Sequence, residues 1–538
     1  MKKYLFVLLA LFLSLSCVFG KEKKKLMFSN KQTITFKINE EGINEWVITP
    51  ELNPDVLNLY SANGKAMKVK FVSDIDSVSF IVKANKPAIH FGIVLNKKDT
   101  AWTEINLTNK IANTLSDKEK IFALSYFWSE AKYNFVFIDK LKFDFDSLYQ
   151  AFIPEILNTK NDFEFYDKME IFAASLKDLH TGIYYNENIY TDYIPISARF
   201  FGEQLQVVSV RDDLAEKVPV GSIILKINDL ETKKYLEKFI LPHIISDFEP
   251  TVKMLAASRL FSSDLISKKI KITYKTPQGQ ILTADLPRDG NSKSGNHIGY
   301  HPSYPSQPIE IIWEEGQIAR LQYNTFYPSE KLIPLFESIK DTLYNAKGLI
   351  IDLRYNRGGS TDVAENLLQY IIKDKYFLEF GYQTRINNGL KKAHGNFVED
   401  YEDFYKDRAF QTFPPDTVFI ADSVKRFDIP TVILISERTC SAAEDFLIML
   451  KERADRPMFI GRTTMGSTGS PLVLSKWNET GMARICTVRV LYPYSQKPFI
   501  EGIAPDILVE YSLDELLESK YDKDVKIAAE YLLKKQVE

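Results

Sequence analysis

The sequence predicts a multidomain protein with an α/β domain in its C-terminal part, and three observations support this. The chain has 538 residues, more than a single hydrophobic core usually serves. Residues 26–106 alternate apolar and polar side chains as β-strands do, whereas strand and helix patterns alternate from residue 308 onward. A stretch rich in Gly, Ser and Pro at 289–307 precedes the α/β part and is typical of a linker.

The N-terminal residues predict that the protein is exported. Lys2 and Lys3 precede a short apolar run that a lysine-rich segment ends, which is the pattern of a signal peptide and not of a spanning helix. We expect cleavage after Gly20, and therefore a signal peptide at 1–20. Cys17 offers an alternative, a lipid anchor, although the usual leucine three residues earlier is absent. Periplasmic, cell-surface and secreted locations all remain open.

Composition limits the classes of partner and cofactor. The formal net charge is −3 and the pI is about 6.2, which gives no reason to expect nucleic acid as a partner. After cleavage only Cys440 and Cys486 remain, and we expect two buried free thiols, although an oxidising compartment would permit a disulfide. No grouping of Cys and His has the spacing of a metal site, so we expect neither metal nor cofactor.

Two regions of different pattern follow the signal peptide. Residues 26–106 predict a small β domain in the form of a β-sandwich, for which a docking role and a spacer role are both open. Residues 107–190 predict a helical segment, whose first helix begins at a capping box of Ser116 and Glu119. The many aromatic residues of this segment are typical of a packed core rather than of a ligand site.

Residues 195–288 predict a second β-rich domain. Strand and hairpin patterns occur at 204–210, 220–228 and 277–279. They resemble a PDZ module, which implies that the C-terminal ends of peptides or proteins bind by strand addition. Because 229–265 is long for such a module, a PDZ-like domain that binds no peptide is the alternative. The linker at 289–307 then leads to the core at 308–538.

A candidate nucleophile lies at a strand-to-helix junction in this core. An apolar run rich in β-branched residues at 432–435 predicts a buried strand, and an apolar stripe at helical spacing follows Ser441. A serine at such a junction has an exposed hydroxyl, nearby backbone N–H groups and a helix dipole that favours developing negative charge. The alternative is that Ser441 caps the helix, with Glu444 completing a capping box.

Two further motifs accompany this junction. A buried strand at 348–354 runs into Gly358-Gly359, which lets backbone N–H groups approach a ligand, and the segment EGIAPD stands at 501–506. With the SAAE sequence at Ser441, these motifs resemble the C-terminal processing peptidases and tricorn-type serine peptidases over most of residues 110–512. The resemblance implies a crotonase-like peptidase core, a β-β-α superhelix. It also implies hydrolysis of peptide bonds in peptide or protein substrates through an acyl-enzyme.

The resemblance also assigns roles to individual residues. It implies that Ser441 is the nucleophile and that N–H groups of Ala442, Gly358 and Gly359 form the oxyanion hole.

The base must differ from that of the processing peptidases, which have a lysine where this sequence has Ser467. A Ser-Lys dyad is therefore absent, and the resemblance to tricorn-type peptidases implies that His180 is the base. Glu501, just before Gly502, is the residue that we predict to orient His180. A histidine base predicts a rising limb of activity at about pH 6–7.

Two alternatives to an enzyme stay open. The core is similar to interphotoreceptor retinoid-binding repeats, which implies a module that binds small apolar ligands, and a catalytically inactive scaffold is the other alternative. A ligand carrier needs neither nucleophile nor base, so the presence of Gly358-Gly359, Ser441-Ala442 and His180 together favours the enzyme. The oligomeric state is not predicted.

Overall fold

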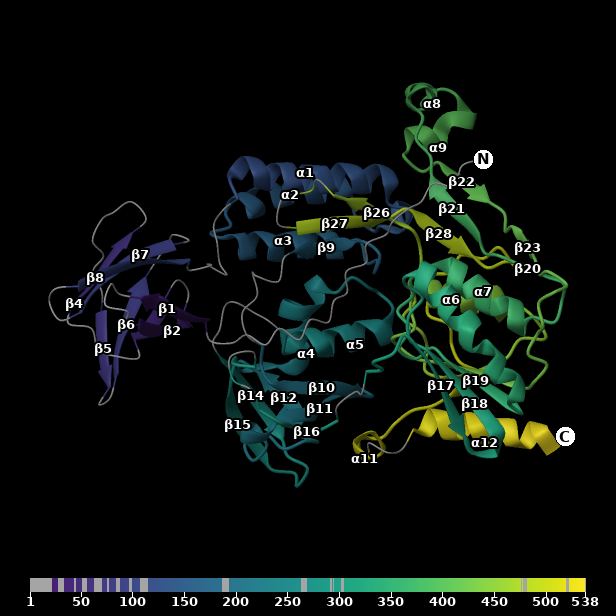
Figure 1. Ribbon diagram of the computed structural model, residues 1–538. Helices are drawn as coiled ribbons and strands as arrows, with labels where there is room; N and C mark the ends of the chain where they lie inside the picture. Colours follow the sequence, from purple (N-terminus) through teal and green to yellow (C-terminus); the bar gives the residue numbers. More distant parts are fainter. Residues whose placement is uncertain are drawn as a thin grey trace.

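The computed structural model describes strands within residues 22–106 and most of residues 115–537, with gaps at 186–192, 263–268, 291–292, 294, 301–303, 476, 478–480 and 519–521. Figure 1 shows several sheets and helical layers along the chain. The predicted mixed α/β architecture is confirmed. None of the helices in the described residues combines the length and apolar character needed to cross a bilayer.

The described parts of residues 22–106 are β-strands in two sheets, as the alternating pattern predicts. One sheet has the order β1-β2-β3-β6-β5 and the other the order β4-β7-β8, and neighbouring strands are antiparallel. The strands are β1 (Glu22–Met27), β2 (Thr33–Gly42), β3 (Glu45–Pro50), β4 (Val56–Ser61), β5 (Lys70–Asp74), β6 (Ser77–Lys83), β7 (Ala88–Leu95) and β8 (Asp99–Asn106).

Three helices follow, α1 (Asp117–Asn134), α2 (Phe145–Leu157) and α3 (Asp162–Ala174). The predicted capping box starts α1, since the Ser116 hydroxyl accepts from the Glu119 N–H and the Glu119 carboxylate accepts from the Ser116 N–H. Aromatic side chains from all three helices share one buried core, as their density predicts, among them Phe127, Phe145, Phe165 and Phe172.

The helical segment is fastened to the far end of the chain. After α3, the short strand β9 (Gly182–Tyr185) joins a sheet of order β26-β27-β9, with β26 (Pro471–Leu474) and β27 (Gly481–Cys486). Trp477, between these two strands, is fully buried and donates its indole N–H to a backbone carbonyl of α1. His180, just before β9, is thereby held against the C-terminal part of the chain.

Residues 196–299 form the second β-rich unit, with sheet order β10-β11-β12-β14-β15. Helix α5 (Glu249–Leu260) packs against β10, the outermost strand of this order. The predicted linker includes β16 (His297–Gly299), which pairs with β11 and so belongs to this sheet. The other elements are β10 (Ile196–Phe201), β11 (Gln204–Arg211), β12 (Ile223–Ile227), β13 (Leu230–Glu231), α4 (Thr232–Tyr235), β14 (Lys269–Lys275) and β15 (Ile281–Pro287).

A six-stranded sheet of order β17-β18-β19-β24-β25-β29 forms the C-terminal core. All neighbours are parallel except β17 and β18, as expected for alternating strands and helices. Its strands are β17 (Ile309–Glu314), β18 (Ile318–Tyr323), β19 (Gly348–Asp352), β24 (Thr431–Ile435), β25 (Met458–Gly461) and β29 (Ile507–Leu508). Its main helices are α6 (Ser329–Ile339), α7 (Thr361–Ile371), α10 (Ala442–Lys451) and α12 (Lys523–Val537).

The central strand β24 is buried on both faces. Ile433 and Ile435 belong to the core beneath α6, α7 and α10, whereas Val432 and Leu434 pack with α12 on the opposite face. A continuous apolar run is the sequence that such a strand requires, because both faces of a covered parallel sheet must be apolar. The carboxyl end of β24 delivers the chain to the turn before Ser441.

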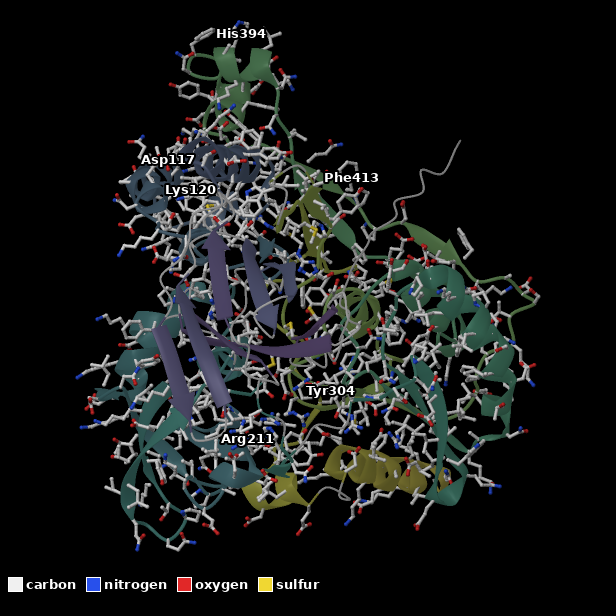
Figure 2. All side chains as sticks on the ribbon, turned by 60° about the vertical axis from the view of Figure 1, so that its left-hand side comes forward. Asp117, Lys120, Arg211, Tyr304, His394 and Phe413 are labelled. Carbon is white, nitrogen blue, oxygen red and sulfur yellow. The ribbon has the colours of Figure 1, made fainter. Side chains whose placement is uncertain are left out.

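Short elements complete the core. Helices α8 and α9 stand out from the body of the molecule, where His394 is labelled in Figure 2. These elements are β20 (Tyr376–Leu378), β21 (Gly381–Arg385), α8 (Gly389–His394), α9 (Glu402–Tyr405), β22 (Phe410–Phe413), β23 (Thr417–Phe419), β28 (Val488–Leu491) and α11 (Leu513–Leu517).

Candidate active site

Ser441 stands in an unusual backbone conformation where β24 gives way to α10. Its φ is 57° and its ψ is −130°, a region that residues with a side chain rarely occupy and that costs about 1–3 kcal/mol. Its hydroxyl makes no capping hydrogen bond to the helix. Ser441 therefore occupies the N-cap position of α10 but does not cap the helix through its side chain, unlike the alternative interpretation of the sequence.

Backbone hydrogen bonds on both sides hold this conformation. The N–H of Ser441 donates to the carbonyl of Ser467 at 2.9 Å, and the N–H of Cys440 donates to the carbonyl of Asn356 at 3.1 Å. The Ser441 carbonyl accepts from the Glu444 N–H at 2.6 Å. Two loops distant in sequence thus fix the serine, because strain of this size persists only where the surroundings over-determine it.

His180 reaches Ser441 from the helical segment. Its Nε2 lies 3.1 Å from Ser441 Oγ and its Nδ1 lies 2.7 Å from Ser467 Oγ, and only 6% of the residue is exposed. If Nε2 accepts the Ser441 proton, Nδ1 carries the ring hydrogen and donates it to Ser467. The next residue, Thr181, is anchored on both sides, because its hydroxyl donates to Asp178 and accepts from the Cys486 N–H.

Burial keeps the imidazole of His180 neutral. It lowers the pKa of His180 to about 3, and the positive charge of Arg484 adds to the effect. Arg484 is held nearby, since it donates to the carbonyl of Leu179. At neutral pH the ring is therefore unprotonated, and its Nε2 can accept a hydrogen bond from a serine hydroxyl.

The loop that carries Ser467 is tied to the nucleophile helix by Glu444. One carboxylate oxygen accepts from the Thr464 hydroxyl and the Gly466 N–H, and the other accepts from the Ser467 N–H at 2.9 Å. Burial raises the pKa of Glu444 to about 8, against the effect of these donors. Glu444 thus fixes the distance between Ser441 and Ser467 and takes no part in a capping box.

The glycine pair provides space and donors beside Ser441. Gly358 has a φ of 91°, and a Cβ there would lie 2.6 Å from Ser441 Cβ, so no other residue fits without displacement. The Gly358 N–H is already donated to the Asn356 side chain at 2.8 Å. Among the described residues, none accepts a hydrogen bond from the N–H of Gly359 or of Ala442. Of the three predicted donors, these two are open to a substrate oxygen.

Glu501 is the predicted site residue that the structure does not bring to His180. The residue is exposed, and Ser467 occupies the Nδ1 side of the ring instead. Its backbone nevertheless passes close to the site, because a Cβ at Gly466 would lie 3.3 Å from the Glu501 carbonyl carbon. The sequence does not predict the contact between Ser467 and His180. The one signal at Ser467 is its position, where the processing peptidases have a lysine.

The two described cysteines are buried free thiols, as predicted. Burial raises the pKa of both thiols well above its ordinary value, which disfavours Cys440 as the nucleophile next to Ser441. Within the described residues, no group of three or more His, Cys, Asp or Glu side chains is placed to hold a metal ion.

Part of the chain matches a known protein family. Residues 317–509 match the family described as Peptidase family S41. This part of the chain is a peptidase family S41 domain. It contains every predicted site residue except His180. The helical segment that supplies His180 lies outside the matched range.

Three further similarities were found, one in sequence and two in fold. The chain is 24% identical over 209 residues to carboxy-terminal processing protease CtpA of Bacillus subtilis strain 168, covering 38% of each protein, so it spans under two fifths of that relative's length. In fold it is similar to mature CPAF complexed with lactacystin (TM-score 0.56, 15% identity, 78% of this chain and 98% of that one). A second structure of mature CPAF gives a TM-score of 0.54 at 15% identity, with 78% and 96% covered.

Proposed function

We propose that the protein is an exported serine endopeptidase in which Ser441 is the nucleophile and His180 the base. The observation that carries this proposal is the 3.1 Å contact between His180 Nε2 and Ser441 Oγ, with the serine strained at a helix N-terminus. A hydroxyl is a weak acid, and a neutral imidazole within hydrogen-bond reach is the usual means of activating it.

The reaction follows from these positions. As Ser441 Oγ attacks the substrate carbonyl carbon, its proton passes to His180 Nε2, and the carbonyl oxygen becomes an oxyanion. The N–H groups of Ala442 and Gly359 stabilise that oxyanion. Collapse of the intermediate breaks the C–N bond, His180 gives its proton to the leaving amine, and an acyl-enzyme remains. Water then hydrolyses the ester by the same proton transfers and restores Ser441.

Ser467 replaces Glu501 in this proposal as the residue that orients the base. As acceptor of the Nδ1 hydrogen, it holds His180 in the tautomer and orientation that direct Nε2 to Ser441. Glu501 would reach this network only if its side chain turned inward from solvent.

We expect Ser467→Ala to lower kcat/KM by about 10- to 100-fold, because it removes one hydrogen bond from a buried ring. Ser467→Thr, which keeps the hydroxyl, is the matched control and should retain most activity. The two variants should have similar Tm values. Equal activity of Ser467→Ala and the parent protein would show that His180 needs no partner at Nδ1.

The burial of His180 sets the expected pH dependence. Because its pKa is lowered to about 3, the base stays neutral far below the pH 6–7 that an ordinary histidine predicts. We expect kcat/KM to remain near its maximum from neutral pH down to about pH 5 and to fall only at more acid pH. Initial rates at saturating and limiting peptide, with circular dichroism at each pH, measure this. A limb at pH 6–7 in folded protein would contradict the buried state of His180 in the free enzyme.

Other parts of the proposal concern location and substrate capture. The curated relative is named a carboxy-terminal processing protease, and we extend action near C-terminal ends to this chain. The outermost position of β10, with α5 packed against it, supports strand addition of a peptide end to a PDZ-like domain. Export rests on the signal peptide predicted at 1–20, and Cys17 offers the alternative of a lipid anchor; both lie outside the described residues. A crotonase-like core and an N-terminal β-sandwich remain part of the proposal.

The deciding experiment combines hydrolysis with covalent labelling. Protein expressed from residue 21 is incubated with an unbiased peptide mixture, and separately with a fluorophosphonate that reacts with activated serines. We expect new peptide termini and a single labelled residue, Ser441, located by mass spectrometry. Folded protein that neither cleaves nor labels would contradict the proposal, and labelling at another serine would move the nucleophile.

A further inference from the structure

Residues 244–251 of the second β-rich unit contact both of the loops that bring His180 and Ser467 together. Lys177, in the turn before His180, donates from its ammonium group to the carbonyl of Ile244 at 2.8 Å. The hydroxyl of Thr251, in the first turn of α5, donates to the carbonyl of Met465 at 2.7 Å. One short segment thus reaches the loops on both sides of the hydrogen bond between His180 Nδ1 and Ser467 Oγ.

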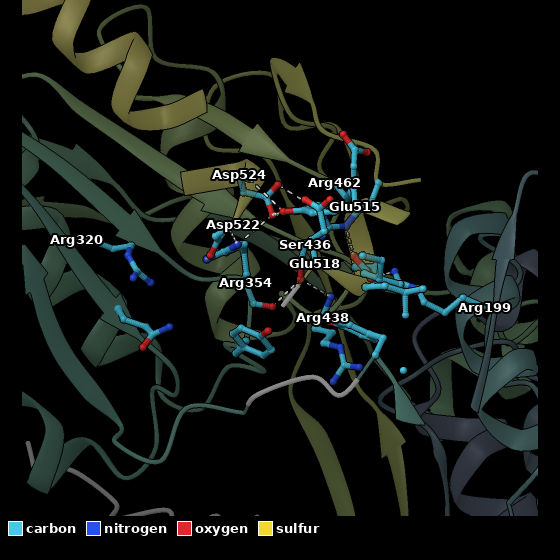
Figure 3. A pocket seen from close by; sticks show the side chains of 18 residues that line it. Arg199, Arg320, Arg354, Ser436, Arg438, Arg462, Glu515, Glu518, Asp522 and Asp524 are labelled. Carbon is cyan, nitrogen blue, oxygen red and sulfur yellow. Dashed lines mark hydrogen bonds and ion pairs between the residues drawn. The ribbon is translucent and has the colours of Figure 1, made fainter. Parts of the chain in front are cut away.

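The second β-rich unit is itself fastened to the rest of the chain by ion pairs. Arg259 of α5 pairs with Glu170 of α3 at 2.6 Å. Arg199 of β10 pairs with Glu437, in the turn before Ser441, at 2.7 Å. Figure 3 shows Arg199 extending from the unit toward the core. Residues 244–251 therefore have a fixed position from which they can hold a loop.

The core holds the loop before Ser467 by its N–H groups. Those of Gly466 and Ser467 donate to Glu444, and that of Met465 donates to a carbonyl of the core at 3.0 Å. The Met465 carbonyl is bonded by Thr251 instead, and among the described residues no other donor reaches it. Thr251 is fully buried. Removal of its hydroxyl would therefore leave a carbonyl without a partner, which costs more than the bond itself contributes.

Little free space surrounds the residue between Met465 and Ser467. Gly466 has a φ of 82°, and a Cβ there would lie 2.8 Å from the backbone N of Gly502 and 3.2 Å from Cδ1 of Phe248, the residue before α5. The loop is thus enclosed by α5 on one side and by the backbone at Gly502 on another. In such close packing a displacement at Met465 passes to Ser467 rather than being absorbed between them.

We propose that Thr251 is a positioning residue for the proposed reaction, because its hydroxyl holds the Met465 carbonyl and so sets the place of Ser467 and the orientation of His180. This inference rests on the roles proposed for Ser441 and His180. It adds a residue that lies outside the matched range 317–509. Thr251 contacts none of the reacting atoms, so its loss should lower kcat and leave KM little changed.

Thr251→Val tests the proposal, since it keeps the shape of the side chain and removes only the hydroxyl. We expect kcat to fall by about 5- to 20-fold, KM to stay within about twofold, and fluorophosphonate labelling of Ser441 to slow by a factor similar to that of kcat. Thr251→Ser, which keeps the hydroxyl, should retain most activity. Thr232→Val is the matched control, because the Thr232 hydroxyl donates to a carbonyl within the same unit at 2.8 Å. It should cleave and label as the parent does, with a Tm similar to that of Thr251→Val.

Combination with Ser467→Ala tests the route of the effect. If Thr251 acts through Ser467, the double variant should cleave at the rate of Ser467→Ala within about twofold, because the hydroxyl that Thr251 positions is already gone. Should Thr251→Val unfold, Thr251→Ala and Thr251→Ser, which differ by the hydroxyl alone, provide the same comparison.

The outcomes separate this inference from the proposed function. Effects of the two substitutions that multiply, or a Thr251→Val protein with the parent's kcat and labelling rate, would overturn the role of Thr251 while Ser441 and His180 keep theirs. Folded parent protein that neither cleaves nor labels would instead overturn the proposed function, and this inference with it.

Discussion

Ser441→Ala is expected to abolish peptide hydrolysis, with kcat/KM lower by about 10⁴-fold or more. The substitution removes the hydroxyl that contacts His180 Nε2, so the acyl-enzyme has no atom on which to form. The fold should survive, because the side chain caps no helix and its backbone is held by main-chain hydrogen bonds. Loss of one hydrogen bond, about 1 kcal/mol, corresponds to a Tm change of no more than about 4 °C.

Rates and Tm of Ser441→Ala are measured beside Ser338→Ala, whose hydroxyl donates to a carbonyl within α6 away from the site. Ser338→Ala should match the parent in both quantities. Unfolding of Ser441→Ala would mean that the serine is structural, and undiminished cleavage would mean that the nucleophile lies elsewhere.

His180→Gln is expected to lower kcat/KM by about 10²- to 10⁴-fold, the usual contribution of a general base. Glutamine is close in size and keeps polar atoms near Ser441 and Ser467, but it cannot accept the hydroxyl proton at neutral pH. Fluorophosphonate labelling of Ser441 should slow by a similar factor, because it depends on the same activation. The residual rate should rise with pH as hydroxide substitutes for the missing base.

His243→Gln is the control for this variant, since His243 is a partly buried histidine that pairs with Asp167. It should leave the rate unchanged. Unchanged labelling in His180→Gln would show that Ser441 is activated by another group, and the assignment of His180 as base would then fail.

Local patterns in the sequence could predict the elements around the nucleophile. The β-branched run at 432–435 and the helix after Ser441 are short-range features, and both appear where the pattern places them. The role of Gly358 could also be predicted from neighbouring residues, because a glycine pair after a buried strand indicates a close approach of the backbone.

Contacts between distant residues could not be predicted in the same way. Ser467 lies 287 residues from His180, and a serine in a glycine-rich loop has no pattern that names its partner. The position of Glu501 in a motif predicts its role, but a motif does not fix the direction of a side chain, and the Glu501 side chain is exposed. Strands as short as β9 and β16 carry too few residues for any period to be recognised.

The pairing of β9 with β27 has a consequence for the time at which proteolysis can begin during translation. His180 emerges from the ribosome 261 residues before Ser441, and the strand that holds its segment in place ends only at Cys486. A nascent chain therefore carries His180 and Ser441 without the strand pairing that joins them until residue 486 has been made. On the proposed roles of Ser441 and His180, we expect the nascent chain to have no hydrolytic activity until this strand has been made.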